Sequence, residues 1–93
     1  MWQLFEHRRL DRKLARLPND VLKRYEKWKD IVRISGPSGL RSIRGFQDEN
    51  LRGERRGCRS SRLGYKYRII YRVEAARIRV LVLDLTAHDY RMK

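Results

Sequence analysis

A few side chains in the C-terminal half of the sequence are of the types that can cleave a phosphodiester bond. Cutting RNA without a metal needs a base for the 2′-hydroxyl, a cation for the charge on the phosphate and an acid for the leaving 5′-oxygen. His88 is the natural acid, because histidine titrates near neutral pH and residue 88 follows the last expected strand. Arg68 fits the cation, since it lies in an expected central strand. Tyr90 can stack on a base or donate to a phosphate.

Each of these residues also has an ordinary structural explanation. His88 can be a surface histidine beside an aspartate, Arg68 can form a cross-strand ion pair, and Tyr90 can pack at the edge of the sheet. Glu49 and Glu54 are acids within a basic stretch, where a carboxylate can act as the base or simply balance charge. The spacing alone does not distinguish these alternatives.

The charge of the chain favours a polyanionic partner. Its 24 Lys and Arg against 11 Asp and Glu give a net charge of +13, and basic surface supplies most non-specific affinity for nucleic acids. Basic residues gather before and along the expected sheet, and we expect these to bind RNA: Arg52, Arg55, Arg56, Arg59, Arg62, Lys66 and Arg72. The alternative is a merely solvated basic face.

Hydrophobic periodicity indicates which elements position these residues. A short lead-in strand is expected around residues 2–7, followed by an amphipathic helix over residues 8–17. A second helix, with Asn19 or Asp20 as its N-cap, extends to Gly36-Pro37 and carries an apolar stripe. The stripe consists of Val21, Tyr25, Trp28 and Val32.

The second half of the chain reads as a sheet. Residues 38–57 form a loop-rich connection, and strands are expected over residues 58–63, 65–73 and 77–85. Residues 65–73 alternate, which places Arg68 on the polar side. We therefore expect an α+β fold in two layers, with the N-terminal strand and a helical hairpin packed on a curved antiparallel β-sheet whose other face is open and basic.

Length and composition exclude several classes of protein. With 93 residues we expect a single domain over residues 1–93, without a second lobe for a cofactor. The single Cys58 precludes an internal disulfide, and two histidines make a metal site improbable. No apolar run is long enough to span a membrane and no signal peptide is evident, so we expect a cytoplasmic protein with no metal and no small-molecule cofactor.

Four short motifs, taken in order, resemble the RelE/ParE superfamily of toxins from bacterial type II toxin–antitoxin systems. They are Glu49-Asn50-Leu51-Arg52-Gly53, Arg59-Ser60-Ser61-Arg62-Leu63, Tyr67-Arg68-Ile69-Ile70-Tyr71 and His88-Asp89-Tyr90-Arg91. Nearly the whole chain is covered, and within the superfamily the sequence is similar to the YoeB-like and HigB-like branches. The resemblance implies a RelE-like two-layer fold, a cognate antitoxin, and a metal-independent endoribonuclease that cleaves mRNA on the ribosome, in contact with ribosomal RNA, and so inhibits translation.

The resemblance also implies roles for individual residues. Glu49 would be the general base, Arg68 the phosphate clamp, His88 the acid and Tyr90 a base-stacking or orienting group. One residue separates His88 from Tyr90, whereas the two corresponding groups are adjacent in the YoeB-like pattern, so which of them lies at the scissile phosphate stays open.

Two other functions remain compatible with the sequence. ParE-like members of the superfamily poison DNA gyrase, which requires neither an acid nor a base. The chain can also be an inactive relative that binds RNA or titrates an antitoxin without turnover.

Overall fold

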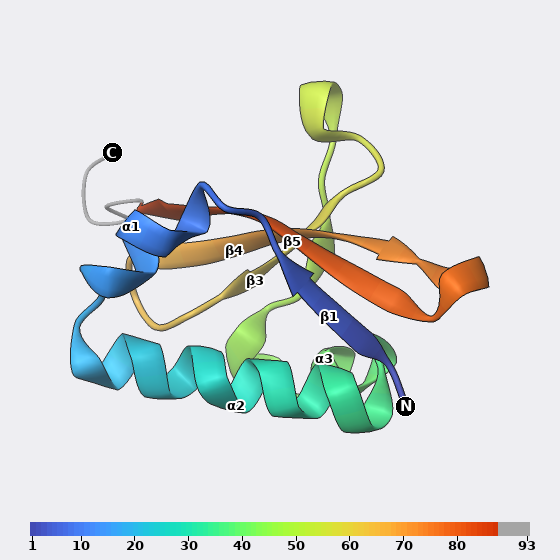
Figure 1. Ribbon diagram of the computed structural model, residues 1–93, viewed down its shortest axis with the longest axis horizontal. Coiled ribbons are helices and arrows are strands. Elements are labelled where there is room, and N and C mark those ends of the chain that lie inside the picture. Colours follow the sequence, from blue (N-terminus) through green and yellow to red (C-terminus); the bar gives the residue numbers. More distant parts are fainter. Residues whose placement is uncertain (88–93) are drawn as a thin grey trace.

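The computed structural model describes residues 1–87 of the chain (Figure 1). Its strands are β1 (Gln3–Glu6), β2 (Glu49–Asn50), β3 (Arg59–Arg62), β4 (Tyr67–Glu74) and β5 (Arg79–Ala87). Its helices are α1 (Leu10–Ala15), α2 (Asn19–Ser35) and α3 (Ser38–Arg41), with short 3-10 turns η1 (Arg44–Phe46), η2 (Gly53–Arg55) and η3 (Ala75–Arg77).

The five strands form one sheet in the order β1-β5-β4-β3-β2. The strands from β2 to β5 pair antiparallel, as expected. The expected lead-in strand, β1, pairs parallel with β5 and forms the edge of the sheet. The cause is topological: the chain leaves β1 through two helices and returns to the same edge only with its last strand.

α2 lies across one face of the sheet and supplies the centre of the core (Figure 1). Its stripe of Val21, Tyr25, Trp28 and Val32 is buried, which confirms the prediction from periodicity. Trp28 stacks on Tyr25 and meets the ring of Tyr71 edge-on, with centroids 5.8 and 5.2 Å apart. The expected N-cap is wrong, because Pro18 occupies that position and no side chain caps the helix.

α1 is shorter than expected and does not cover the sheet face together with α2. β1 ends at Glu6, and α1 lies beside the second half of β5, continuing the edge of the sheet (Figure 1). Leu10 is fully buried there. This position brings the polar side of α1 close to β5.

The segment expected to be a loop, residues 38–57, contains three short helical turns and β2. Leu40 and Phe46 are buried, and Ile43 between them packs against the core. Their spacing of three residues is that of a 3-10 or α turn. Glycines and arginines between them concealed this signal in the sequence. The part of the segment that carries η2 stands above the sheet, on the side opposite α2 (Figure 1).

A bulge in β5 decides which side chains face each side of the sheet. Ile70 pairs with Asp84 and the next residue, Tyr71, pairs with Val82, so the pairing skips Leu83. The extra residue lets both Leu85 and Val82 face the core. Asp84 consequently lies on the open face, which is the face away from α2.

Candidate nucleic-acid interface

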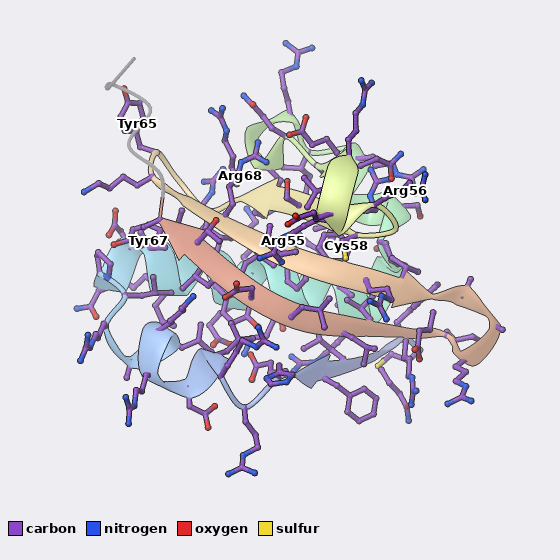
Figure 2. All side chains as sticks on the ribbon, turned by 90° about the horizontal axis from the view of Figure 1, so that it is seen from above. Arg55, Arg56, Cys58, Tyr65, Tyr67 and Arg68 are labelled. Atoms are coloured by element: carbon purple, nitrogen blue, oxygen red, sulfur yellow. The ribbon has the colours of Figure 1, made fainter. Side chains whose placement is uncertain are left out.

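Arg68 lies on the open face of the sheet, as the alternation in β4 predicted. Figure 2 views this face from the side opposite α2, with Arg68 on β4 and Arg55 and Arg56 on the segment above it. The side chain of Arg68 is 17% exposed and is rooted in a strand that has neighbours on both sides. A cation held this way presents its donors in a fixed direction.

Glu49 and Ser60 hold the guanidinium of Arg68. Both terminal nitrogens donate to Oε2 of Glu49, each at 3.0 Å, and Nη1 also donates to the hydroxyl of Ser60. Glu49 and Ser60 face each other in the register of β2 and β3. The structure therefore brings together two of the predicted site residues, Glu49 and Arg68. Glu49 is 56% exposed, so solvent and ligands can reach the pair.

A second arginine concentrates positive charge beside this pair. Arg62 on β3 is directly opposite Arg68 on β4. Like charges that face each other across strands destabilise a sheet. In the free protein, the carboxylate of Glu49 offsets part of the positive charge of Arg62 and Arg68. A bound phosphate would offset it as well.

Arg59, which was predicted to bind RNA, instead takes part in a buried network on the core side. Its side chain is 15% exposed, and its Nη2 lies 2.7 Å from Oδ1 of Asp48, whose side chain is fully buried. Nη1 donates to Asn50 at 2.6 Å. The guanidinium therefore has a structural role here. Arg59 and Arg62 are three residues apart, which places them on opposite faces of the strand.

Asp48 joins β3, β4 and α2 through this network. Its Oδ2 accepts hydrogen bonds from the hydroxyls of Ser61, at 2.6 Å, and Tyr71, and Ser61 in turn accepts from the indole nitrogen of Trp28 at 2.9 Å. Burial and the Asp48 carboxylate raise the pKa of Tyr71 far above its usual value. Burial alone would lower the pKa of Arg59, but the hydrogen bond and charge of Asp48 outweigh it and raise that pKa. The role of Asp48 could not be predicted from the sequence, because its hydrogen-bond partners come together only in the folded chain.

The other predicted RNA-binding residues are spread over the surface. All of them except Arg62 are exposed, and Arg62 is partly buried. Arg52, Arg55 and Arg56 belong to the segment around η2, Lys66 lies in the turn before β4, and Arg72 lies on β4. Glu54, the alternative acid, is exposed within η2.

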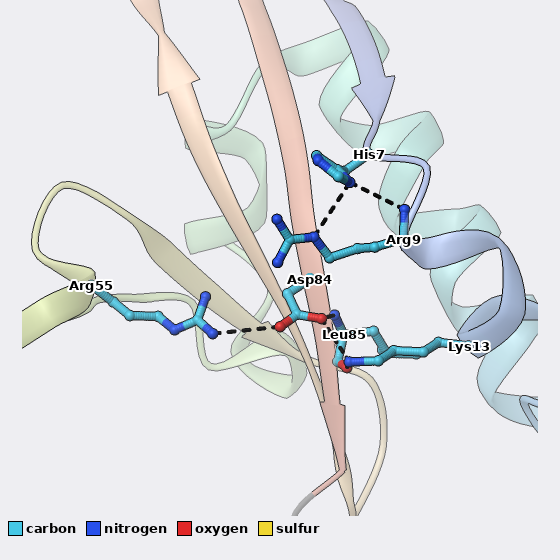
Figure 3. Close-up of polar contacts among 6 residues, drawn as sticks. All are labelled: His7, Arg9, Lys13, Arg55, Asp84 and Leu85. Carbon is cyan, nitrogen blue, oxygen red and sulfur yellow. Dashed lines mark hydrogen bonds and ion pairs between the residues drawn. The ribbon is translucent and has the colours of Figure 1, made fainter.

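A second charged cluster on the open face, which sequence analysis did not single out, centres on Asp84 (Figure 3). Nζ of Lys13, from α1, donates to Oδ1 of Asp84 at 2.8 Å and to the carbonyl of Leu85 at 3.0 Å. From the opposite side, Nη2 of Arg55 lies 3.4 Å from Oδ2 of Asp84. Burial alone would raise the pKa of Asp84, but the hydrogen bonds from Lys13 and the Leu85 amide, with the charges of Lys13 and Arg55, lower it.

Two predicted site residues, His88 and Tyr90, lie outside the described residues. Within residues 1–87, no group of three or more His, Cys, Asp or Glu side chains is placed to hold a metal ion. None of the helices in this part of the chain is long and apolar enough to cross a membrane. The described site therefore comprises Arg68 with Glu49 and Ser60, together with the cluster around Asp84.

The fold, a five-stranded sheet with one long helix on one face, is similar to solved structures of RelE-type toxins. A chain of the archaeal RelE–RelB complex from Pyrococcus horikoshii OT3 is similar, with a TM-score of 0.76 and 23% identity over 96% of this chain and 97% of that one. A chain of the heterotetrameric YoeB–YefM toxin–antitoxin complex from Staphylococcus aureus gives a TM-score of 0.72 and 14% identity, over 95% and 98% of the two chains.

The isolated RelE toxin of E. coli is also similar, with a TM-score of 0.67 and 22% identity over 96% of this chain and 86% of that one. No protein-family model matches the sequence. A comparison with curated protein sequences gives no significant match. The fold that the sequence motifs implied is thus confirmed at the level of structure.

Proposed function

We propose that this protein is the toxin of a type II toxin–antitoxin pair, a member of the RelE/ParE superfamily that cleaves mRNA on the ribosome. The observation that carries the proposal is the fixed contact between Arg68 and Glu49 on the open face, with both guanidinium nitrogens 3.0 Å from one carboxylate oxygen. The similarity in fold to solved toxin structures, over more than nine-tenths of this chain, supports it.

In the proposed reaction, the non-bridging oxygens of an RNA phosphodiester replace the carboxylate as partners of Arg68. Arginine suits this exchange, because its planar guanidinium binds phosphate and carboxylate in the same forked geometry. The displaced Glu49 is then next to the phosphate and can accept the proton of the 2′-hydroxyl. Ser60 keeps Arg68 oriented during the exchange.

The deprotonated 2′-oxygen forms a bond to phosphorus as the bond from phosphorus to the 5′-oxygen breaks. His88 gives its proton to the leaving 5′-oxygen, and Tyr90 stacks on a base or orients the phosphate. The pairing of Thr86 with Arg68 supports this role for His88, which follows Thr86 by two residues in the sequence. Base, cation and acid are all protein side chains in this scheme, so it requires no metal.

A cognate antitoxin is part of the proposal. The similar chain from S. aureus comes from a toxin–antitoxin complex. The open face of this protein is basic and its net charge is +13, so the antitoxin should carry an acidic segment that covers this face.

Mapping the 5′ ends of cellular messages after brief expression tests the proposal. Wild-type protein should produce new ends within coding sequences, whereas His88→Ala and Arg68→Gln should reduce them by about 10²-fold or more. Asp30→Asn, on the exposed surface of α2, is the control and should cleave like wild type. Toxicity with intact messages and damaged DNA would instead indicate a ParE-like gyrase inhibitor, and intact messages without toxicity would indicate an inactive relative.

A further inference from the structure

The cluster around Asp84 presents two cations to solvent above one buried carboxylate. The side chains of Lys13 and Arg55 are 47% and 46% exposed, whereas Asp84 is only 8% exposed as a residue. The two cations come from α1 and from the segment around η2, which approach β5 from opposite sides (Figure 3). Asp84 is the group that holds them together, because like charges would otherwise separate.

This cluster lies one step along the sheet from Arg68. Arg68 pairs with Thr86, and Asp84 is two residues earlier on the same strand and the same face. Asp84 is therefore a diagonal neighbour of Arg68 on the adjacent strand, and such neighbours lie about 7–8 Å apart. That separation is on the scale of one nucleotide step along a single RNA strand.

We propose that Lys13 and Arg55, positioned by Asp84, form a second phosphate-binding site for the phosphodiester adjacent to the one at Arg68. This inference rests on the proposed function for the nature of the ligand, a single-stranded RNA. Lys13 is fixed by two acceptors, Asp84 and the carbonyl of Leu85. Within residues 1–87, the guanidinium of Arg55 contacts Oδ2 of Asp84 through Nη2, and its side chain is 46% exposed, which leaves its other donors accessible to a ligand.

For the effect of Asp84→Asn on the affinity for RNA, this role of Asp84 predicts the opposite sign from net charge alone. Asp84→Asn makes the protein more positive by one charge, which by itself strengthens binding of a polyanion. If Asp84 positions the two cations, the same substitution weakens binding, because Lys13 and Arg55 are no longer held in place. Asp30→Asn makes the same change of charge on α2, away from the open face, and is the matched control.

The probe is a trinucleotide of 2′-O-methyl RNA, which cannot be cleaved for lack of a free 2′-hydroxyl. Its affinity is compared with that of the same trinucleotide in which one linkage is an uncharged methylphosphonate. Wild type and Asp30→Asn should prefer the two-phosphate probe by about tenfold, the value of one charge-assisted contact. Lys13→Gln, Arg55→Gln and Asp84→Asn should each reduce this preference to about twofold.

Asp84→Asn should also bind the two-phosphate probe more weakly than wild type. The proposal is overturned if that variant binds as tightly as wild type, or if Arg55→Gln and Lys13→Gln keep the tenfold preference. If Asp84→Asn does not fold, Lys13→Gln and Arg55→Gln still test the proposal. Because the probe is not cleaved, a protein that binds it as described but never cuts messages would refute the proposed function and leave this inference standing.

Discussion

The ion pair between Arg68 and Glu49 unites two interpretations that the sequence left as alternatives. Arg68 is in a cross-strand ion pair and is also a candidate phosphate ligand, because the carboxylate occupies the place that a phosphate would take. In the free protein, the guanidinium of Arg68 and the carboxylate of Glu49 neutralise each other. In the proposed reaction, replacement of the carboxylate by phosphate frees Glu49 to act as the base, so that binding of RNA and activation of Glu49 would be one event.

At the residue scale, Asp84 gives a prediction for stability against pH. Its pKa is lowered in the folded protein by Lys13, the Leu85 amide and Arg55, against the opposing effect of burial. A group with a lowered pKa stabilises the fold above its unfolded pKa, about 3.9 for aspartate, and loses that contribution as the pH falls below this value. Asp84→Asn should therefore destabilise the protein at pH 7 and by much less at pH 2.5.

Urea unfolding at the two pH values measures this difference. Asp30→Asn serves as the reference, since Asp30 is in an exposed ion pair with Arg33 and should change stability by less than about 1 kcal/mol at either pH. An equal effect of Asp84→Asn at pH 7 and pH 2.5 would contradict the assigned pKa shift.

At the element scale, Asp48 links β3, β4 and the segment before β2. Asp48→Asn keeps the size of the side chain but leaves the poorly exposed guanidinium of Arg59 without its counter-ion. Breaking a buried pair in this way costs about 3–5 kcal/mol. Tyr71→Phe, which removes only the hydroxyl that donates to Asp48, should cost about 1.5–3 kcal/mol.

Chemical denaturation of the two variants measures both costs. Asp30→Asn again controls for the loss of one negative charge. If Asp48→Asn is no more destabilising than Asp30→Asn, the network does not hold these elements together.

The local pattern of hydrophobic residues in the sequence predicted some of these elements well and others poorly. The stripe of α2 is buried, and in β4 the alternate residues Ile69 and Tyr71 are buried while Tyr67 and Val73 pack against the core, so periodicity was sufficient for both elements. The parallel pairing of β1 with β5 joins residues more than 70 positions apart, and no local pattern reports on it. The turns at Leu40 and Phe46 were hidden by the glycines and arginines around them.

Part of the candidate site could also be predicted from the sequence. Arg68 followed from strand parity, and Glu49 came from the family resemblance and proves to contact it. Asp84 was missed because a bulge in β5 determines that it faces the open side. The ion pair of Arg59 with Asp48 was not expected, because a basic stretch in the sequence does not show that neighbouring arginines lie on opposite faces.

At the scale of the whole molecule, the net charge of +13 and the open basic face predict binding of RNA that depends steeply on salt. Each phosphate contacted on a single strand contributes about −0.7 to the slope of log K against log salt concentration. For an uncleavable decanucleotide that makes about four contacts, the slope should be near −3. Arg52→Gln, in the exposed segment beside η2, should reduce its magnitude by about 0.7.

Fluorescence titrations between about 50 and 300 mM salt give this slope. Asp30→Asn should leave it unchanged, because it alters charge away from the open face. A slope near zero in wild type would show that the excess positive charge does not serve RNA binding.

The measurement that bears most directly on the central claim is the chemical identity of the ends that the purified protein leaves on a message in programmed ribosomes. Attack by the 2′-oxygen with departure of the 5′-oxygen predicts a 2′,3′-cyclic phosphate on the upstream fragment and a 5′-hydroxyl on the downstream one. Glu49→Gln and Arg68→Gln should each slow formation of these ends by about 10²-fold or more. A 5′-phosphate on the downstream fragment, or full activity in both variants, would contradict the assignment of Arg68 and Glu49 to a single phosphodiester.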